Sequence, residues 1–152
     1  MTETLLAPTF LFRFSVPCRH FEPLWPAKGT ELGPEYALPS FGELEGRPKF
    51  ADVRAAWSQE GLLLTVHVSG KKQNVWCRSS RLEDSDGLHV WIDTRDTHNI
   101  HRASRFCHRF ALLPAGGGSA ETQPVARLLA INRAREDPKS VADSTLGIRA
   151  LV

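Results

Sequence analysis

The sequence has little cysteine and no long apolar run. Its 152 residues include three cysteines, Cys18, Cys77 and Cys107, which lie far apart and outside any CxxC pair. The odd number leaves at least one thiol unpaired within the chain, which argues against a disulfide scaffold and favours a reducing compartment. No apolar run is long enough to span a bilayer, so we expect no membrane partner.

The N-terminus also lacks the features of a secretion signal. It has no basic n-region, and Arg13 interrupts the apolar residues 10–16. We therefore expect a cytoplasmic protein. A misassigned start codon that hides a signal peptide would instead make it a secreted one.

Catalytic motifs and a strong charge of one sign are missing as well. No serine lies in a Gly-x-Ser-x-Gly elbow, and the cysteines lack an activating setting. The sequence contains neither a phosphate loop nor a dinucleotide fingerprint. We therefore expect a protein that is not an enzyme. The formal net charge of +2 is too small to indicate nucleic acid as a partner.

Alternating apolar and polar residues predict β-strands in the middle of the chain. Residues 53–57 and 62–69 flank a four-residue turn that ends in Gly61, and together they predict a β-hairpin. Residues 88–93 and 106–113 predict two more strands, the second closed by a proline and a run of glycines.

Other segments are less regular. Residues 17–48 contain six prolines, a density that predicts a long loop, and its aromatic side chains indicate that it packs across the domain. Residues 10–16 predict a strand with an aromatic face. Residues 125–132 fit a helix or a strand, and we favour a strand because the segments before them are β.

We therefore predict one all-β domain over residues 1–152, an immunoglobulin-like or jelly-roll-like β-sandwich with a long Pro-rich N-terminal loop.

The alternation also predicts which strand faces are buried, because successive side chains of a strand point to opposite faces. In the second hairpin strand the predicted core face consists of Leu62, Leu64, Val66 and Val68. In the next strand it consists of Leu88, Val90 and Ile92.

The opposite face of the strand over residues 88–93 carries the strongest functional signal. It places a tryptophan between two hydrogen-bonding side chains, and such a ring can stack on the apolar face of a sugar. Pairing of this strand with residues 62–69 would add another histidine. The predicted ligand-binding residues are Trp91, His89, Asp93 and His67, and the expected partner is a carbohydrate or a small polar ligand. The alternative is that this face is also buried and Trp91 is a core residue.

Arginines and histidines alternate shortly after this strand. Arg102, Arg105 and Arg109 can hold a phosphate or a carboxylate, since guanidinium groups bind such anions through two hydrogen bonds. This pattern supports an alternative function, an intracellular protein-interaction or structural domain with an anion-binding segment. In the other interpretation these arginines pair internally with the acidic residues 83–86, or with Asp93 and Asp96.

The acidic turn before the same strand resembles part of a calcium loop. Asp84 and Asp86 are weak candidate ligands for Ca²⁺, which prefers oxygen ligands, but the distal glutamate of an EF-hand is missing. The alternative is a solvated turn whose carboxylates cap backbone N–H groups. No other cofactor is expected.

Residues 53–114 resemble the family 9 carbohydrate-binding modules and their wider CBM9-like, DOMON-like relatives. The resemblance is carried by AAWSQEGLLLTVHVSGKK, then DSDGLHVWIDTRD, then FCHRFALLP. In that family a hairpin with the pattern GLxxxVxV leads through a loop to a strand with the pattern DxxxVxID. The resemblance implies a β-sandwich that binds sugars or other small ligands without catalysis and is often attached to enzymes.

Two features depart from this family. Relatives continue with an element rich in E…IP and with closing strands, whereas here the sequence stops within the apolar residues 146–152. We therefore expect an incomplete domain that can self-associate through an unpaired sheet edge. Family members with known sugar sites are also usually secreted, and this sequence shows no signal.

Overall fold

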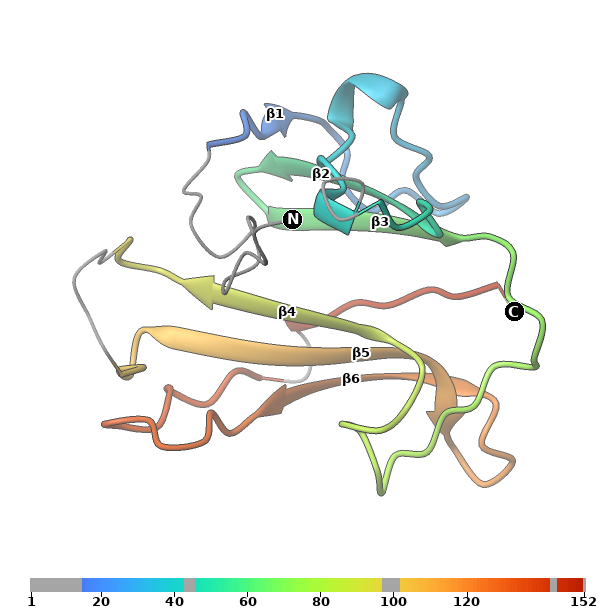
Figure 1. Cartoon of the computed structure of the whole chain (residues 1–152). Coiled ribbons are helices and arrows are strands. Elements are labelled where there is room, and N and C mark those ends of the chain that lie inside the picture. The colour runs from blue at the N-terminus through green and yellow to red at the C-terminus, as the bar shows by residue number, and fades with distance from the viewer. Residues whose placement is uncertain (1–14, 43–45, 97–101, 143–144, 152) are drawn as a thin grey trace, which may run out of the picture. The chain divides into compact units, whose positions relative to one another are not determined.

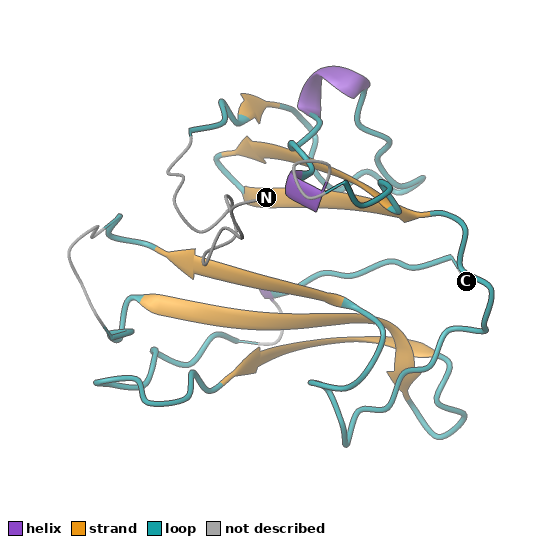
Figure 2. Cartoon of the chain, in the orientation of Figure 1, coloured by secondary structure: helices purple, strands orange, loops and turns teal. Residues whose placement is uncertain are grey.

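The computed structural model describes residues 15–42, 46–96, 102–142 and 145–151. In this part of the chain most of the regular structure is β, arranged as two three-stranded sheets (Figures 1 and 2). Helix is limited to short 3₁₀ turns such as η2 (Pro34–Tyr36). The predicted all-β class is therefore confirmed. The strand predicted over residues 10–16 lies almost entirely outside the described residues.

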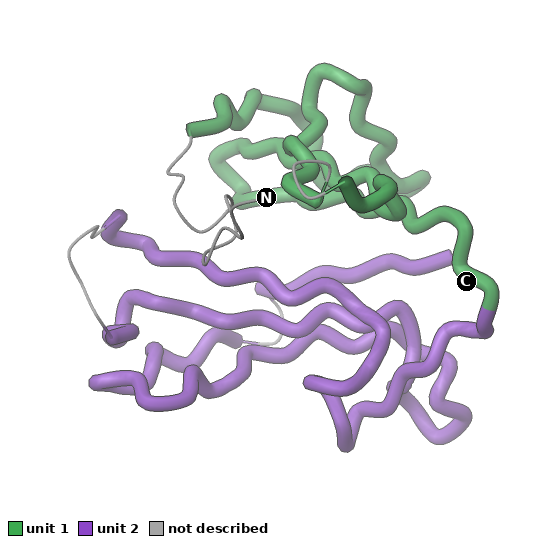
Figure 3. The backbone as a smooth tube through the Cα atoms, viewed as in Figure 1, with its two compact units in different colours: residues 1–72 green, residues 73–152 purple. Residues whose placement is uncertain are grey.

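The chain divides into two compact units, Met1–Lys72 and Gln73–Val152, which we call unit 1 and unit 2 (Figure 3). Each unit contains one of the sheets. No helix among the described residues has the length and the apolar character that crossing a bilayer requires.

The sheet of unit 1 contains the predicted hairpin. Strands β2 (Ala51–Ser58) and β3 (Gly61–Val68) pair in antiparallel fashion across a two-residue turn. Gly61 has a φ of +148°, a value that L side chains rarely adopt, so the turn depends on a glycine there. A short strand, β1 (Arg19–His20), pairs in parallel with β2 and completes the sheet.

The proline-rich segment packs on this sheet, as its aromatic residues predicted. Arg54 of β2 donates a hydrogen bond from Nη1 to the carbonyl of Leu32, and its Nε and Nη2 bind the carboxylate of Asp52. The segment and the hairpin together form one hydrophobic cluster. Its buried members are Leu24, Leu32, Ala56 and Leu63, with Phe21 and Tyr36 packed against them.

This cluster corrects the predicted core face of β3. Leu63 is only 7% exposed, whereas Leu62 is 51% exposed and Val66 and Val68 are exposed as well. Residues 62–64 are three consecutive leucines, so both faces of the strand are apolar there and periodicity alone does not select one. The proline-rich segment decides the choice, because it supplies buried leucines on the side of Leu63.

The sheet of unit 2 is antiparallel, with the order β4, β5, β6 (Figure 1). Its strands are β4 (Leu88–Asp93), β5 (Cys107–Gly117) and β6 (Gln123–Leu129). The predicted strand over residues 88–93 is confirmed as β4, and residues 123–129 form a strand and not a helix. Leu88, Val90 and Ile92, the predicted core face of β4, are only half-buried. β5 runs past Pro114, which was predicted to close it, and an irregularity in its pairing between Leu113 and Gly117 accommodates this extension.

The core of unit 2 lies on the sheet face that also carries Trp91. Trp91 is directly opposite Arg109 in the ladder, and Ala111 and Leu113 follow Arg109 on the same face of β5. Ala111 and Leu113 have no exposed surface, and Val125 opposite Leu113 is also buried. This face is therefore covered at one end and open to solvent at Trp91.

Residues 146–151, the end of the apolar run that the sequence places at the C-terminus, belong to none of the strands in the described part of the chain.

Candidate functional site

Trp91 lies in the middle of β4 and is 59% exposed. It is the most exposed of the four tryptophans, a residue type that is highly buried on average in folded proteins. The alternative interpretation of Trp91 as a core residue is therefore wrong. A large exposed ring on a sheet is a candidate contact for a ligand.

Arg109 of β5 holds the Trp91 ring. Its Cζ atom lies 4.9 Å from the ring centroid, the geometry of a cation–π interaction. Its Nη1 donates to the Glu83 carboxylate at 2.7 Å, and its Nη2 lies 3.4 Å from Nδ1 of His89. The Arg109 side chain is only 15% exposed, and its buried Nε has no hydrogen-bond partner. One face of the ring is therefore covered by a guanidinium group that is itself fixed by an ion pair.

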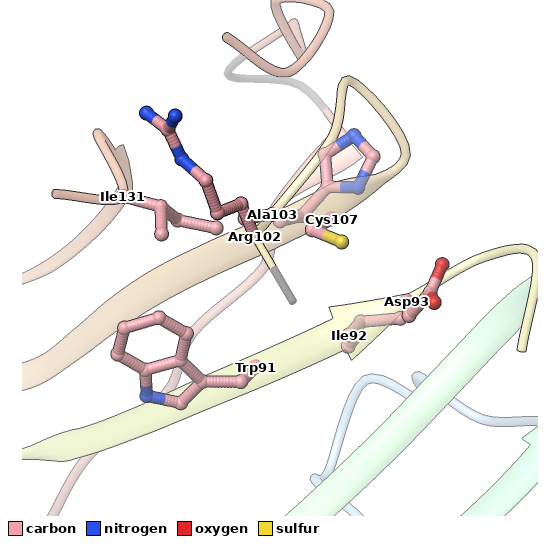
Figure 4. A pocket seen from close by; sticks show the side chains of 8 residues that line it. Trp91, Ile92, Asp93, Arg102, Ala103, Cys107 and Ile131 are labelled. Atoms are coloured by element: carbon pink, nitrogen blue, oxygen red, sulfur yellow. The ribbon is translucent and has the colours of Figure 1, made fainter. Parts of the chain in front are cut away.

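A shallow, open depression of about 370 Å³ lies beside Trp91. Its volume falls within the range of small-molecule sites. Figure 4 shows the Trp91 ring on one side of the depression and the side chains of Ile131 and Arg102 on the other. The remaining lining residues are Ile92, Asp93, Ala103, Cys107 and His108. The depression thus combines an aromatic ring with a carboxylate, a guanidinium group, a thiol and an imidazole.

Asp93 is the last residue of β4, and its side chain caps the turn that follows. Its Oδ1 accepts a hydrogen bond from the backbone N–H of Arg95 at 3.0 Å. This contact orients the carboxylate, which can accept hydrogen bonds at both of its oxygens.

Arg102 is held by backbone carbonyl groups. Its Nε donates to the carbonyl of Arg133 at 2.9 Å, and its Nη2 lies 3.5 Å from the carbonyl of Ala134. Arg102 also lines a second depression, of about 570 Å³, together with Ala103, Asn132 and Arg133. The two depressions meet at Arg102 and Ala103.

Three of the four predicted ligand-binding residues lie together on one strand, and the fourth belongs to the other sheet. His89, Trp91 and Asp93 alternate on one face of β4. His67 lies in β3, which pairs with β2, whereas β4 pairs with β5. The expected pairing of β3 with β4 is wrong because alternation identifies strands and faces but contains no information on which strands are neighbours.

The three arginines of the predicted anion site have separate partners. Arg109 pairs with Glu83, as the alternative of internal pairing with the acidic residues predicted. Arg105 lies over the ring of Phe106, with its Cζ 5.0 Å from the ring centroid. Arg102 binds the two carbonyl groups described above, and of the three it alone lines both depressions.

The candidate calcium ligands are engaged elsewhere. Asp84 forms an ion pair with Arg81 at 2.6 Å, and Asp86 accepts a hydrogen bond from the backbone N–H of Trp76 at 2.7 Å. Within the described residues, no three or more His, Cys, Asp or Glu side chains are grouped to hold a metal ion. The contact of Asp86 agrees with the alternative of a turn whose carboxylates cap backbone N–H groups.

Sequence reasoning missed Arg109 as the partner of Trp91, and it missed the side of the depression formed by Ile131. The first depends on the register of β5 against β4, and the second on where the chain runs after β6, and neither can be read from the sequence. A scan against protein-family models and searches of curated proteins and of solved structures gave no match. The resemblance to family 9 modules therefore depends on the sequence motifs alone.

Proposed function

We propose that this chain is a non-catalytic carbohydrate-binding β protein that holds a sugar ring against Trp91. The observation that carries the proposal is the exposure of Trp91 on a strand, with one ring face fixed by Arg109. A fixed, solvent-accessible ring offers an apolar surface at a low cost in conformational entropy on binding.

The residues around the ring supply the polar part of such a site. The C–H groups of a pyranose stack on the indole, while its hydroxyl groups need hydrogen-bond partners. Asp93 accepts hydrogen bonds through its carboxylate, and His89 presents an imidazole on the same strand face. His67 lies in β3, in the sheet of unit 1, and the proposed site is built from residues of unit 2.

We also propose that the fold is a β-sandwich of the family 9 type. The support is the strand content of both units and the three sequence segments that resemble that family. Binding without catalysis follows from the same resemblance and from the lack of a catalytic motif in the sequence.

A binding experiment with matched tryptophan variants tests the proposal. The full chain is screened against neutral and acidic polysaccharides by affinity gel electrophoresis, and positives are measured by calorimetry. Trp91→Ala is expected to abolish binding. Trp76→Ala is the matched control, because Trp76 is also exposed, at 40%, and lies near the guanidinium groups of Arg78 and Arg81. Equal loss in both variants, or no binding by the unmodified chain, would contradict the proposal.

A further inference from the structure

We infer that the saccharide bound at Trp91 carries an acidic group, a carboxylate or a sulfate, and that Arg102 binds this group. The inference rests on the proposed function and names the ligand class of the same site. It depends on the position of Arg102 at the junction of the two depressions, with Trp91 lining the first and Arg133 lining the second.

The guanidinium group of Arg102 is oriented but not neutralised. Its hydrogen bonds go to carbonyl oxygens of Arg133 and Ala134, which fix the plane of the group and leave its positive charge in place. Among the described residues it forms no ion pair with a carboxylate. A fixed guanidinium group with free hydrogen-bonding capacity is well suited to bind an oxyanion.

Four other arginines among the described residues have their charge or their guanidinium group engaged by the protein. Arg54 pairs with Asp52, Arg81 with Asp84 and Arg109 with Glu83. Arg105 lies over the ring of Phe106. Arg102 therefore differs from them, and it lines both the depression beside Trp91 and the second depression.

The second depression adds further donors for an anion. It is lined by the guanidinium-bearing Arg133 and by Asn132, whose amide can donate hydrogen bonds. Like Arg102, Arg133 forms no ion pair within the part of the chain that is described. Two unneutralised cations beside one hollow favour a negatively charged ligand over a neutral one.

Calorimetric titration of the full chain with defined oligosaccharides tests this inference. The probes are galacturonate oligomers, a sulfated oligosaccharide of similar length, and the methyl-esterified galacturonate oligomers, which are neutral. At least one acidic probe is expected to bind about 10-fold or more tightly than the neutral ester, since a charge-assisted hydrogen bond contributes about a factor of 10 to 100 in affinity. The acidic probe that binds more tightly shows whether the site prefers a carboxylate or a sulfate.

The matched variants are Arg102→Gln and Arg105→Gln, which remove the same charge inside and outside the depressions. Arg102→Gln is expected to lose the preference for the acidic probe, while Arg105→Gln keeps it. Arg102→Lys, which keeps the charge but not the planar fork, should retain part of the preference. Circular dichroism melts of each variant establish that it is folded.

The outcomes separate this inference from the proposed function. If acidic and neutral probes bind with equal affinity and Trp91→Ala abolishes the binding of both, the role of Arg102 is wrong and the sugar site at Trp91 is supported. Equal losses in Arg102→Gln and Arg105→Gln would show that only net charge matters and would also overturn it. If no saccharide binds, both the proposed function and the inference are wrong.

Discussion

The Arg109 guanidinium group lies over the Trp91 indole, with its Cζ 4.9 Å from the ring centroid and the two residues directly opposite each other on β5 and β4. The stack joins an exposed ring to a largely buried cation, and Glu83 fixes the cation from the acidic turn. An exposed tryptophan on β4 is thereby held in one orientation before any ligand arrives, which lowers the entropic cost of binding.

The first prediction concerns this pair. Arg109→Ala should lower the free energy of unfolding by about 1–2 kcal/mol, because it removes the cation–π contact and the packing of the arginine stem. Glu83→Gln should cost less than about 1 kcal/mol, since Glu83 is largely exposed and its ion pair is screened by solvent. Urea unfolding of both variants measures the difference. A larger loss in Glu83→Gln than in Arg109→Ala would contradict this description of the pair.

The second prediction tests the buried face of β3. Leu63→Ala should cost about 2–4 kcal/mol, because Leu63 is 7% exposed within the cluster of unit 1. Leu62→Ala, at an adjacent position that is 51% exposed, should cost less than about 1 kcal/mol. Denaturant melts of the two variants measure these losses. A larger loss in Leu62→Ala than in Leu63→Ala would support the core face predicted from periodicity.

The sequence predicted several strands correctly but not the buried face of β3. Strands β2, β3 and β4 were predictable because their residues alternate and because a short turn with Gly61 joins the first two. The buried face of β3 was not, because three leucines in a row satisfy both faces and the deciding contacts come from Leu24 and Leu32.

The candidate site was predictable to a similar extent. Trp91 and Asp93 follow from one strand pattern, since both positions are set by the local chain. The contact of Arg109 with Trp91 and the pairing of β3 with β2, not with β4, depend on strand pairing that the local sequence does not encode. Alternation of side chains contains no information about such pairing.

The third prediction uses the close approach of Gly87 to β5. A Cβ atom at Gly87 would lie 2.6 Å from Cδ2 of Leu113 and 2.7 Å from the carbonyl oxygen of Leu112. Gly87→Ala should therefore lower the free energy of unfolding by about 1–3 kcal/mol, because the carbonyl oxygen of Leu112 belongs to β5 and cannot move without disturbing the sheet. Gly42→Ala is the control, since its Cβ would meet no atom nearer than 3.6 Å. Similar melting temperatures for the two variants would contradict this packing of Gly87.

The fourth prediction is a pH dependence in unit 1. The hydrogen bond from Arg54 lowers the pKa of Asp52 below its ordinary value of 3.8. Because the folded-state pKa is the lower one, the ion pair stabilises the fold fully above pH 3.8, and this contribution is lost as the pH falls through the folded-state pKa. Asp52→Asn should therefore melt below the unmodified chain at neutral pH, with a difference that shrinks in acid. Thermal melts across this range give the result, and a difference that grows in acid would contradict the sign.

The most direct test of the account is a titration of the isotope-labelled full chain with the oligosaccharide that binds best, followed through the indole N–H signals of the four tryptophans. Trp91→Ala identifies the Trp91 signal by its disappearance. This signal is expected to shift on binding, while the signals of Trp25, Trp57 and Trp76 stay in place. A stationary Trp91 signal during saturable binding, or a shift confined to another tryptophan, would contradict a sugar site at Trp91.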